Sequence, residues 1–294
     1  MKTKNLSFTY SGNSTPTLHG ISTEFAVNTI TALLGPNGSG KTTLMQLLAG
    51  RIRNHSGEIQ LNNQSASLDQ LSKDVIYVGN ASEYAEYPIG DLLAFLRLRT
   101  NWNEALYQQL LDRFNLHPNL RKAFKKLSSG EGNLLMAVFA LASEAPVTLL
   151  DEIQANLDVP TRYRLYETII ELNARTADGT GPARTFVISS HMVEELETLC
   201  EEVKIIDRGK LVFADSTEAL RGKYLSIQGS LADIEKFQVA HPQLQTSSSR
   251  TLGSYAELVV NVPAAGLPNL NDFPTLTSQP LSFQDAFVAQ LAKD

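Results

Sequence analysis

The stretch "ITALLGPNGSGKTTLMQLLAG", residues 30–50, decides the fold class of this chain. An apolar, strand-like run breaks into a loop with three glycines, and a helix-like segment begins at Lys41. The loop matches the pattern G-x-x-x-x-G-K-[ST] from Gly35 to Thr42, between the strand and the helix that this pattern requires. Successive N–H groups of such a loop and the positive end of the helix dipole form a nest for phosphates. The sequence therefore predicts a nucleoside triphosphate site, in which Lys41 reaches the β- and γ-phosphates and the Thr42 hydroxyl binds Mg²⁺.

Composition places the chain among ordinary globular proteins. The 294 residues are 43% hydrophobic, which supports a packed core, and no apolar run approaches the roughly 18–20 residues of a membrane span. The N-terminus has no apolar stretch typical of a signal peptide, and the single cysteine, Cys200, cannot form an internal disulfide. A net charge of −6 argues against binding nucleic acid through a basic surface. We expect a cytosolic protein that does not bind nucleic acid directly.

The order of apolar patterns predicts an α/β domain followed by a smaller one. Strand-like runs and a helix alternate in residues 1–80, residues 83–145 are mostly helical, and the α/β pattern returns at residue 147. This alternation predicts a largely parallel sheet with covered faces, over residues 1–221. Residues 222–294 read as a small α+β appendix with two strands, "YLSIQG" and "AELVVNV", and two short helices. No internal repeat is visible, so we expect one nucleotide-binding unit per chain.

Two carboxylates follow a buried strand in "VTLLDEIQANLD", residues 147–158. The carboxyl edge of a parallel sheet is where such folds bind their ligands. Asp151 there can hold Mg²⁺ directly or through water, and Glu152 can polarise the water that attacks the γ-phosphate. Acidic residues at a strand end are also often merely solvated. Because the phosphate loop is present in the same chain, we favour the functional interpretation.

Two further segments complete the pattern. The strand "TFVISSH" delivers His191 to the same sheet edge, where an imidazole could bind the γ-phosphate and the attacking water. A lone histidine is more often structural, but its position favours function here. The segment "KKLSSGEGN", residues 125–133, is a second Ser/Gly loop that opens a helix, and it is built like another anion site. Since the chain already has one phosphate loop, this second loop must serve elsewhere.

Taken in order, these motifs resemble those of the nucleotide-binding subunits of ATP-binding cassette (ABC) transporters, over roughly residues 2–220. "GPNGSGKT" is similar to the Walker A loop, "VTLLDE" to the Walker B strand with its catalytic glutamate, and "LSSGE" to the signature LSGGQ. "ANLD" resembles the D-loop and "SSH" the switch-histidine segment. The resemblance implies a P-loop NTPase fold of the ABC type, with a helical subdomain over about residues 83–145, and hydrolysis of ATP with Mg²⁺.

The resemblance also implies a role for individual residues. Glu152 and His191 would be catalytic, and Thr42, Asn80 and Asp151 would hold the metal. Tyr10 would stack on the adenine of the nucleotide. The Walker A loop and the start of its helix would bind the phosphates, through Gly35, Pro36, Asn37, Gly38, Ser39, Gly40, Lys41, Thr42 and Thr43.

In this family two subunits sandwich two ATP molecules head to tail, each between one Walker A loop and the other subunit's signature loop. The resemblance therefore implies that the partner's nucleotide is contacted by Ser128, Ser129, Gly130 and Glu131. A chain with both halves of a site and no repeat needs a dimer to complete it. The partner could be a second copy or a different ATPase subunit.

The chain departs from the family pattern at four positions. Asn80 replaces a glutamine and is one methylene shorter, which affects its reach to Mg²⁺ and the lytic water. In the signature, Ser129 replaces a glycine and Glu131 a glutamine, and a carboxylate facing phosphates would repel them by about 1 kcal/mol. Ile153 replaces the proline that usually follows the glutamate. These changes favour slow or asymmetric hydrolysis.

A finer resemblance links "NWNEALYQQLLDRFNL", "PLSFQDAFVAQLA" and the C-terminal appendix to the ATPases of ABC-2-type exporters, whose membrane subunit is a separate chain. It implies an ATPase that drives export through a separate transmembrane permease, at the inner face of the cell membrane. Residues 83–96 lie where family members receive a helix of the permease, but their aromatic side chains could equally form the core of the helical insert.

Two other functions use a phosphate loop. A soluble ABC ATPase acting on ribosomes or nucleic-acid complexes normally carries two tandem cassettes or long coiled-coil inserts, and neither is seen here. A small-molecule kinase does not account for "LSSGE", "ANLD" and His191 together.

Overall fold

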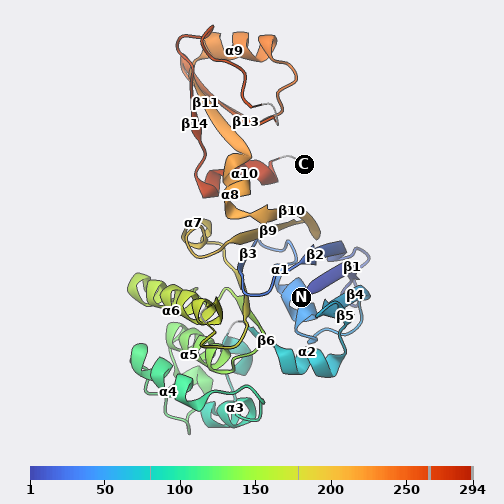
Figure 1. Ribbon diagram of the computed structural model, residues 1–294, viewed down its shortest axis with the longest axis vertical. Helices are drawn as coiled ribbons and strands as arrows, with labels where there is room; N and C mark the ends of the chain where they lie inside the picture. The colour runs from blue at the N-terminus through green and yellow to red at the C-terminus, as the bar shows by residue number, and fades with distance from the viewer. Residues whose placement is uncertain (80, 178, 264–265, 293–294) are drawn as a thin grey trace. The chain divides into compact units, whose positions relative to one another are not determined.

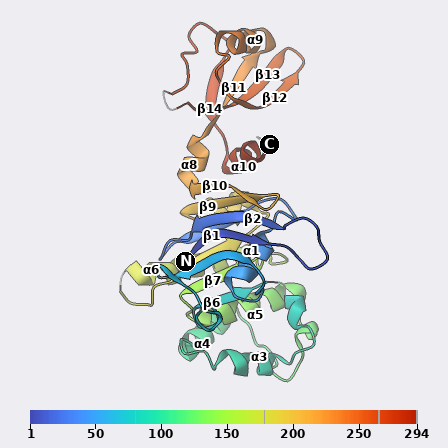
Figure 2. The same cartoon turned by 90° about the vertical axis from the view of Figure 1, so that its right-hand side faces the viewer.

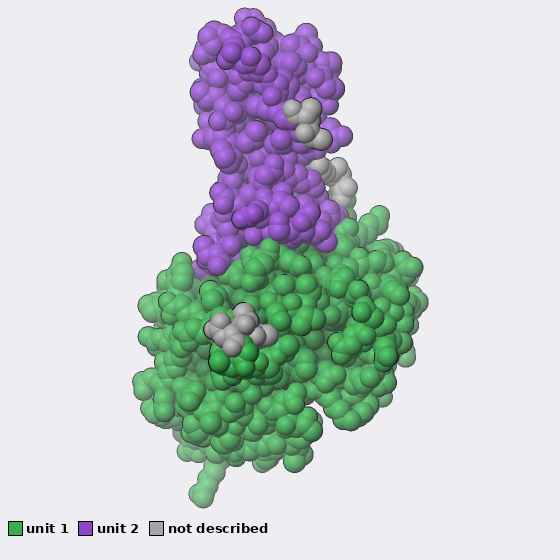
Figure 3. All heavy atoms as spheres, viewed as in Figure 1, with its two compact units in different colours: residues 1–191, 199–211 green, residues 192–198, 212–294 purple. Residues whose placement is uncertain are grey.

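The computed structural model describes residues 1–79, 81–177, 179–263 and 266–292. The chain divides into two compact units, which Figure 3 shows in different colours. Unit 1 comprises residues 1–191 and 199–211, and unit 2 comprises residues 192–198 and 212–294.

The centre of unit 1 is formed by strands in the order β9-β3-β8-β7-β6, and the sixth strand of this sheet, β10, begins in unit 1 and ends in unit 2. The strands of this sheet are β3 (Ile30–Leu34), β6 (Val75–Val78), β7 (Val147–Asp151), β8 (Thr185–Ser189), β9 (Glu202–Asp207) and β10 (Lys210–Ser216). Strand β3 pairs in parallel with β8 and β9, and β7 pairs in parallel with β6 and β8. All residues of β3, β7 and β8 are buried, as in a parallel sheet covered on both faces. The predicted parallel sheet is therefore confirmed.

The N-terminal strands do not join that sheet, although the sequence grouped them with it. They form a separate antiparallel sheet in the order β2-β1-β4-β5 (Figure 1), with the bounds β1 (Lys2–Phe8), β2 (Leu18–Glu24), β4 (Ser56–Leu61) and β5 (Gln64–Ser65). Helix α1 (Lys41–Leu48) packs with both sheets, because Leu44 and Leu48 share one buried cluster with Leu6 of β1 and Leu33 of β3. The phosphate loop that precedes α1 is thereby anchored on two sides.

The segment after β6 is helical, as predicted. Its elements are η1 (Ala81–Tyr84), α3 (Ile89–Leu96), α4 (Glu104–Arg113), η2 (Phe124–Lys126) and α5 (Ser129–Ala142), and α3, α4 and α5 lie together at one end of unit 1 in both views (Figures 1 and 2). Helix α5 is buried continuously from Gly132 to Ala142, so it forms the core of this insert. Unit 1 also contains α2 (Leu68–Asp74) and α6 (Val159–Ala177).

Unit 2 has its own sheet and core. The sheet runs in the order β12-β13-β11-β14, and its pairs are antiparallel. Its elements are α7 (Val193–Leu196), α8 (Thr217–Gly222), β11 (Tyr224–Ser230), α9 (Leu231–Ala240), β12 (Thr246–Leu252), β13 (Tyr255–Asn261), β14 (Thr277–Pro280) and α10 (Phe283–Leu291). Ile234 and Phe237 of α9 pack on Ile227 of β11 and Leu258 of β13.

Two of these strands carry no apolar pattern that would have revealed them. Strand β12 contains the run Ser247–Ser249 and is mostly exposed, and β14 is exposed throughout. Among the described residues, no helix has the length and apolar character needed to cross a membrane.

Arg184 is the largest fully buried side chain in the described part of the protein. Its guanidinium donates hydrogen bonds to the Leu141 carbonyl at 3.0 Å and to the Thr148 hydroxyl at 3.2 Å. Burial lowers the pKa of Arg184 to about 10, so the side chain is still a cation at neutral pH. The last carbonyls of a helix lack partners within the helix and attract cations. Arg184 thus ties the end of α5 to β7.

We predict that Arg184→Ala lowers the free energy of unfolding by about 3 kcal/mol, because it leaves a cavity and unpaired carbonyls. Urea denaturation followed by circular dichroism measures this loss. Arg121→Ala is the matched control, since Arg121 is exposed and its loss should change stability by less than about 0.5 kcal/mol. Equal midpoints for the two variants would contradict the structural role of Arg184.

Candidate functional site

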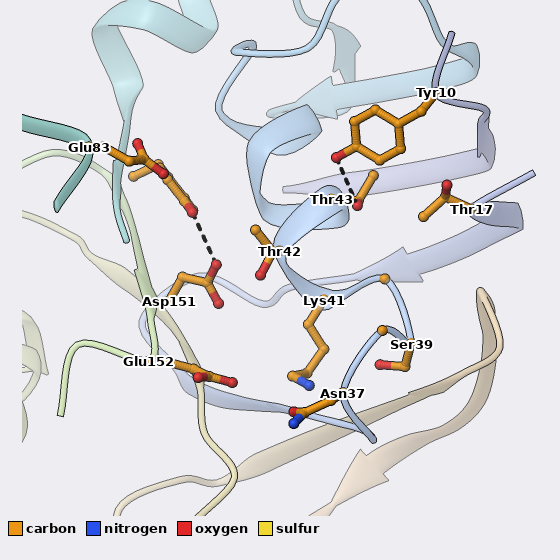
Figure 4. Close-up of a pocket in the computed structure, with 13 residues that line it drawn as sticks. Tyr10, Thr17, Asn37, Ser39, Lys41, Thr42, Thr43, Glu83, Asp151 and Glu152 are labelled. Carbon is orange, nitrogen blue, oxygen red and sulfur yellow. Dashed lines mark hydrogen bonds between the residues drawn. The ribbon is translucent and has the colours of Figure 1, made fainter. Parts of the chain in front are cut away.

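A cavity of about 610 Å³ lies above the phosphate loop at the carboxyl edge of the parallel sheet. Figure 4 shows how its side chains converge from α1, the end of β7 and the loop after β1. Its lining residues are Tyr10, Thr17, Asn37, Gly38, Ser39, Gly40, Lys41, Thr42, Thr43, Tyr77, Glu83, Asp151 and Glu152. Ten of these residues were expected from the sequence to bind nucleotide or metal, or to act in catalysis. Thr17, Tyr77 and Glu83 were not foreseen.

The backbone of the loop explains its glycines. A Cβ atom on Gly35 would lie 2.1 Å from the Ile206 carbonyl oxygen of β9, so no larger residue fits there. Gly40 is the N-cap of α1 and has a φ of 109°, in the left-handed region that favours glycine. Gly35 and Pro36 shape the loop without lining the cavity.

Lys41 is nearly buried at the start of α1. Its ammonium group donates to the Gly35 carbonyl at 2.7 Å and to the Pro36 carbonyl at 3.1 Å. Burial lowers the pKa of Lys41, and the negative charges of Glu152 and Asp151 oppose that shift. A phosphate group would offer this cation oxygen acceptors with the opposite charge.

Both carboxylate oxygens of Asp151 accept hydrogen bonds from hydroxyl groups. Ser189 Oγ donates to Oδ1 at 2.5 Å, and Tyr77 Oη donates to Oδ2 at 3.0 Å, the contact marked by a dashed line at Asp151 in Figure 4. Burial and the charge of Asp151 raise the pKa of Tyr77, so its hydroxyl keeps the proton that it donates. Neither partner could be identified from the sequence, because each lies far along the chain on a neighbouring strand.

Glu152 and His191 come together at the same edge. His191 Nδ1 lies 3.8 Å from Glu152 Oε2, and both side chains are substantially exposed. Glu152 has a φ of 52°, and its N–H donates to Ser189 Oγ at 3.0 Å. Non-glycine residues in this region store strain and gather at functional sites. The turn aims the Glu152 carboxylate into the cavity, where it faces Lys41 (Figure 4).

The chemistry of the donor set fits Mg²⁺. This ion prefers oxygen ligands, keeps several waters, and is held through one or two protein groups together with substrate phosphates. The Thr42 hydroxyl and the Asp151 carboxylate line one cavity and supply such oxygens. Asn80, the third expected ligand, lies outside the described residues.

Tyr10 borders the cavity at the end away from Glu152 (Figure 4). Its ring packs edge-on against Phe8, with centroids 4.7 Å apart, and its hydroxyl lies 3.2 Å from Thr43 Oγ1. Tyr10 is 41% exposed, so its side chain is open to a ligand. The adenine-stacking role implied by the resemblance stays a prediction for Tyr10.

The four signature residues do not line this cavity. Ser128 is the N-cap of α5, and it forms a capping box in which Glu131 Oε2 accepts from the Ser128 N–H at 2.9 Å and from its hydroxyl at 2.8 Å. These hydrogen bonds lower the pKa of Glu131, so it is ionised at neutral pH. Gly130 approaches the D-loop, since a Cβ atom on it would lie 2.6 Å from the Asn156 carbonyl oxygen.

Comparisons with known proteins agree with this geometry. The family model described as ABC transporter matches residues 18–155. An uncharacterised ABC transporter ATP-binding protein of Nostoc, all4389, is 31% identical over 69% of this chain, and the match spans 61% of that relative's length. A probable sulfate/thiosulfate import ATP-binding protein, CysA, of Chlorella vulgaris is 30% identical over 69% of this chain and 86% of its own length.

Solved structures show the same fold. An ATP-binding subunit of an ABC transporter superposes with a TM-score of 0.64 at 22% identity, covering 75% of this chain and 91% of that one. A dimeric ATP-binding cassette in a post-hydrolysis state, bound to ADP and Pi, superposes with a TM-score of 0.60 at 20% identity. The superposition covers 73% of this chain and 97% of that one. With its P-loop fold and its motifs in this order, the chain belongs to the ABC transporter ATP-binding protein family, whose members are ATPases.

Proposed function

We propose that this protein is the ATPase subunit of an ABC exporter, and that ATP-driven dimer closure and hydrolysis move a separate membrane permease. The proposal of a dimer rests on one observation: the signature residues do not line the cavity that contains Lys41, Asp151 and Glu152. One chain has both kinds of phosphate-binding loop, and they do not meet in it. A second ATPase subunit, identical or different, would bring them together.

The described residues support the following division of labour. Lys41 and the N–H groups of the loop bind the phosphates, and Thr42 and Asp151 hold Mg²⁺. When bound, that ion neutralises charge that develops on the phosphate oxygens. Glu152 orients the attacking water and accepts its proton, and His191, 3.8 Å away, supports the γ-phosphate.

A groove between the helical insert and the adjoining residues of α2 and β6 supports the permease as partner. It measures about 400 Å³, and Tyr84, Phe95 and Arg99 are among its lining residues. Segment 83–96 serves two purposes, since Ile89 and Leu93 are buried in the core whereas Phe95 is 67% exposed. An exposed aromatic beside a groove suits an amphipathic helix.

The proposed direction of transport, export, is inferred from the C-terminal residues and from one relative. The daunorubicin resistance ATP-binding protein DrrA3 of Streptomyces coeruleorubidus is 25% identical, and the match covers 70% of this chain and 65% of the length of DrrA3. Other relatives are named for import, as CysA is, so identity alone does not choose the direction. The resemblance of residues 222–294 to exporter ATPases supports export, at the cytoplasmic face of the membrane.

We predict that Glu152→Gln slows ATP hydrolysis at least 100-fold and traps the closed dimer, because the water loses its proton acceptor while the phosphate contacts remain. Light scattering with Mg-ATP should then show the mass rising from one 32.2 kDa chain to two. Lys41→Ala in the same background is the control that abolishes the shift. A Glu152→Gln variant that binds ATP and stays monomeric would rule out a self-sufficient homodimer and point to a partner, either a different ATPase subunit or the permease that holds two copies together.

We predict that Tyr10→Ala weakens ATP binding about tenfold, because aromatic stacking on a base contributes ~1–3 kcal/mol. Tyr10→Phe should bind ATP within about twofold of the unaltered chain, since the ring and its contact with Phe8 are kept. Equilibrium titration with a fluorescent ATP analogue measures both. Equal affinities for the alanine variant and the unaltered chain would exclude adenine stacking at this position.

We predict that Glu131→Gln strengthens the ATP-driven dimer about fivefold. The substitution removes a carboxylate that would face the partner's phosphates, at a cost of about 1 kcal/mol, yet glutamine can still close the capping box. The dimer dissociation constant, measured in the Glu152→Gln background, reports the gain. If the dimer is weakened instead, the Glu131 carboxylate contributes to closure and the repulsion argument is wrong.

A further inference from the structure

Tyr77, which lines the ATP cavity, has no role in the motifs considered so far. It belongs to β6, next to β7, and only 8% of its surface is exposed. Its hydroxyl reaches across to Asp151 Oδ2 at 3.0 Å. With Ser189 on Oδ1, this contact fixes both oxygens of the carboxylate from two different strands.

The position of the Tyr77 hydroxyl explains Gly79. Gly79 follows directly on β6, and a side chain at this position would lie beside Tyr77. A Cβ atom on Gly79 would lie 2.5 Å from Tyr77 Oη, closer than real Cβ atoms come, and 3.0 Å from Cζ, so the tyrosine side chain would have to move. The backbone of Gly79 is not in the left-handed conformation, so the effect of a side chain there would come from its contact with Tyr77.

A third residue holds the Tyr77 ring in place. The Arg51 guanidinium carbon lies 4.9 Å from the ring centroid, at cation–π distance. The same guanidinium pairs with Glu83 Oε2 at 2.9 Å and donates to Tyr84 Oη at 2.7 Å. Arg51 therefore connects the tyrosine to η1, the segment that follows β6.

We propose that Tyr77 is a positioning residue for the metal ligand Asp151, and that its hydroxyl fills the space that a Cβ atom at position 79 would occupy. The inference rests on the proposed Mg-ATP site. Hydrogen-bond donors behind a metal-binding carboxylate fix its orientation, and their loss typically costs 10–100-fold in metal affinity. Tyr77 acts on the metal through Asp151 and needs no contact with the nucleotide.

The test compares the affinity for a fluorescent ATP analogue with Mg²⁺ and with EDTA. The ratio of the two dissociation constants measures how much the metal contributes. For Tyr77→Phe we expect this ratio to fall about tenfold, while the affinity in EDTA stays within about twofold. Tyr224→Phe is the matched control, because it removes another buried tyrosine hydroxyl, which bonds Gln290 Oε1 at 2.9 Å in unit 2.

Gly79→Ala adds a second, independent arm. A methyl group at position 79 should displace the hydroxyl and lower the metal contribution, but it should add nothing once Tyr77→Phe has removed that hydroxyl. A double-mutant cycle measures this coupling. Two effects that simply multiply would show that Gly79 acts independently of Tyr77 and would overturn the proposal.

The possible failures can be told apart. If Mg²⁺ does not affect nucleotide binding by the unaltered chain, the proposed function itself fails. If Mg²⁺ strengthens binding equally in the unaltered chain and in Tyr77→Phe, only the role of Tyr77 is wrong. If Tyr77→Phe weakens binding equally with Mg²⁺ and with EDTA, the tyrosine supports the pocket as a whole, and the positioning role is overturned.

Discussion

The pairing register of β7 with β8 is the constraint on which the candidate site depends. It places Asp151 opposite Ser189, and the serine hydroxyl donates to the carboxylate and accepts from the Glu152 N–H. A slip of one residue would turn every side chain of a strand to the other face of the sheet. Because β7 and β8 are buried along their whole length, such a slip would be costly. A packing constraint therefore sets the geometry of the proposed metal ligand and the proposed base.

The same edge is joined to the signature helix. Gly130 lies against the Asn156 carbonyl, and Asn133 Nδ2 donates to the Ala155 carbonyl at 2.9 Å. These contacts connect α5 to the turn that follows Glu152. If this turn moved when the γ-phosphate is cleaved, the N-terminus of α5 would move with it through these contacts. In the proposed dimer, that N-terminus faces the partner's nucleotide, so the two ATP sites would be coupled through a few backbone contacts.

Features that depend on residues close together in the sequence could be predicted, whereas features that depend on distant segments could not. The phosphate loop was identifiable because glycines, Lys41 and Thr42 act within one strand–loop–helix segment. Tyr77 and Ser189 were not, since their hydrogen bonds to Asp151 depend on which strands become neighbours and on where side chains point. Likewise, alternation detected the strands of the central sheet, but the polar strand β12 offers no such signal. The N-terminal strands were recognisable as strands, but their own antiparallel sheet follows from pairing between distant segments.

Ile153, which replaces the usual proline after Glu152, shows how the strained turn is stabilised without a proline. Ile153 is 2% exposed and packs into the core, and the fully buried Gln154 donates through Nε2 to the Ser189 carbonyl at 3.0 Å. Proline would stiffen this turn by fixing a dihedral angle, whereas here burial and a hydrogen bond on either side of position 153 hold it. Ser189 thus contributes its hydroxyl to Asp151 and its carbonyl to Gln154. The orientation of the metal ligand and the strained backbone of the proposed base are therefore coupled through one residue.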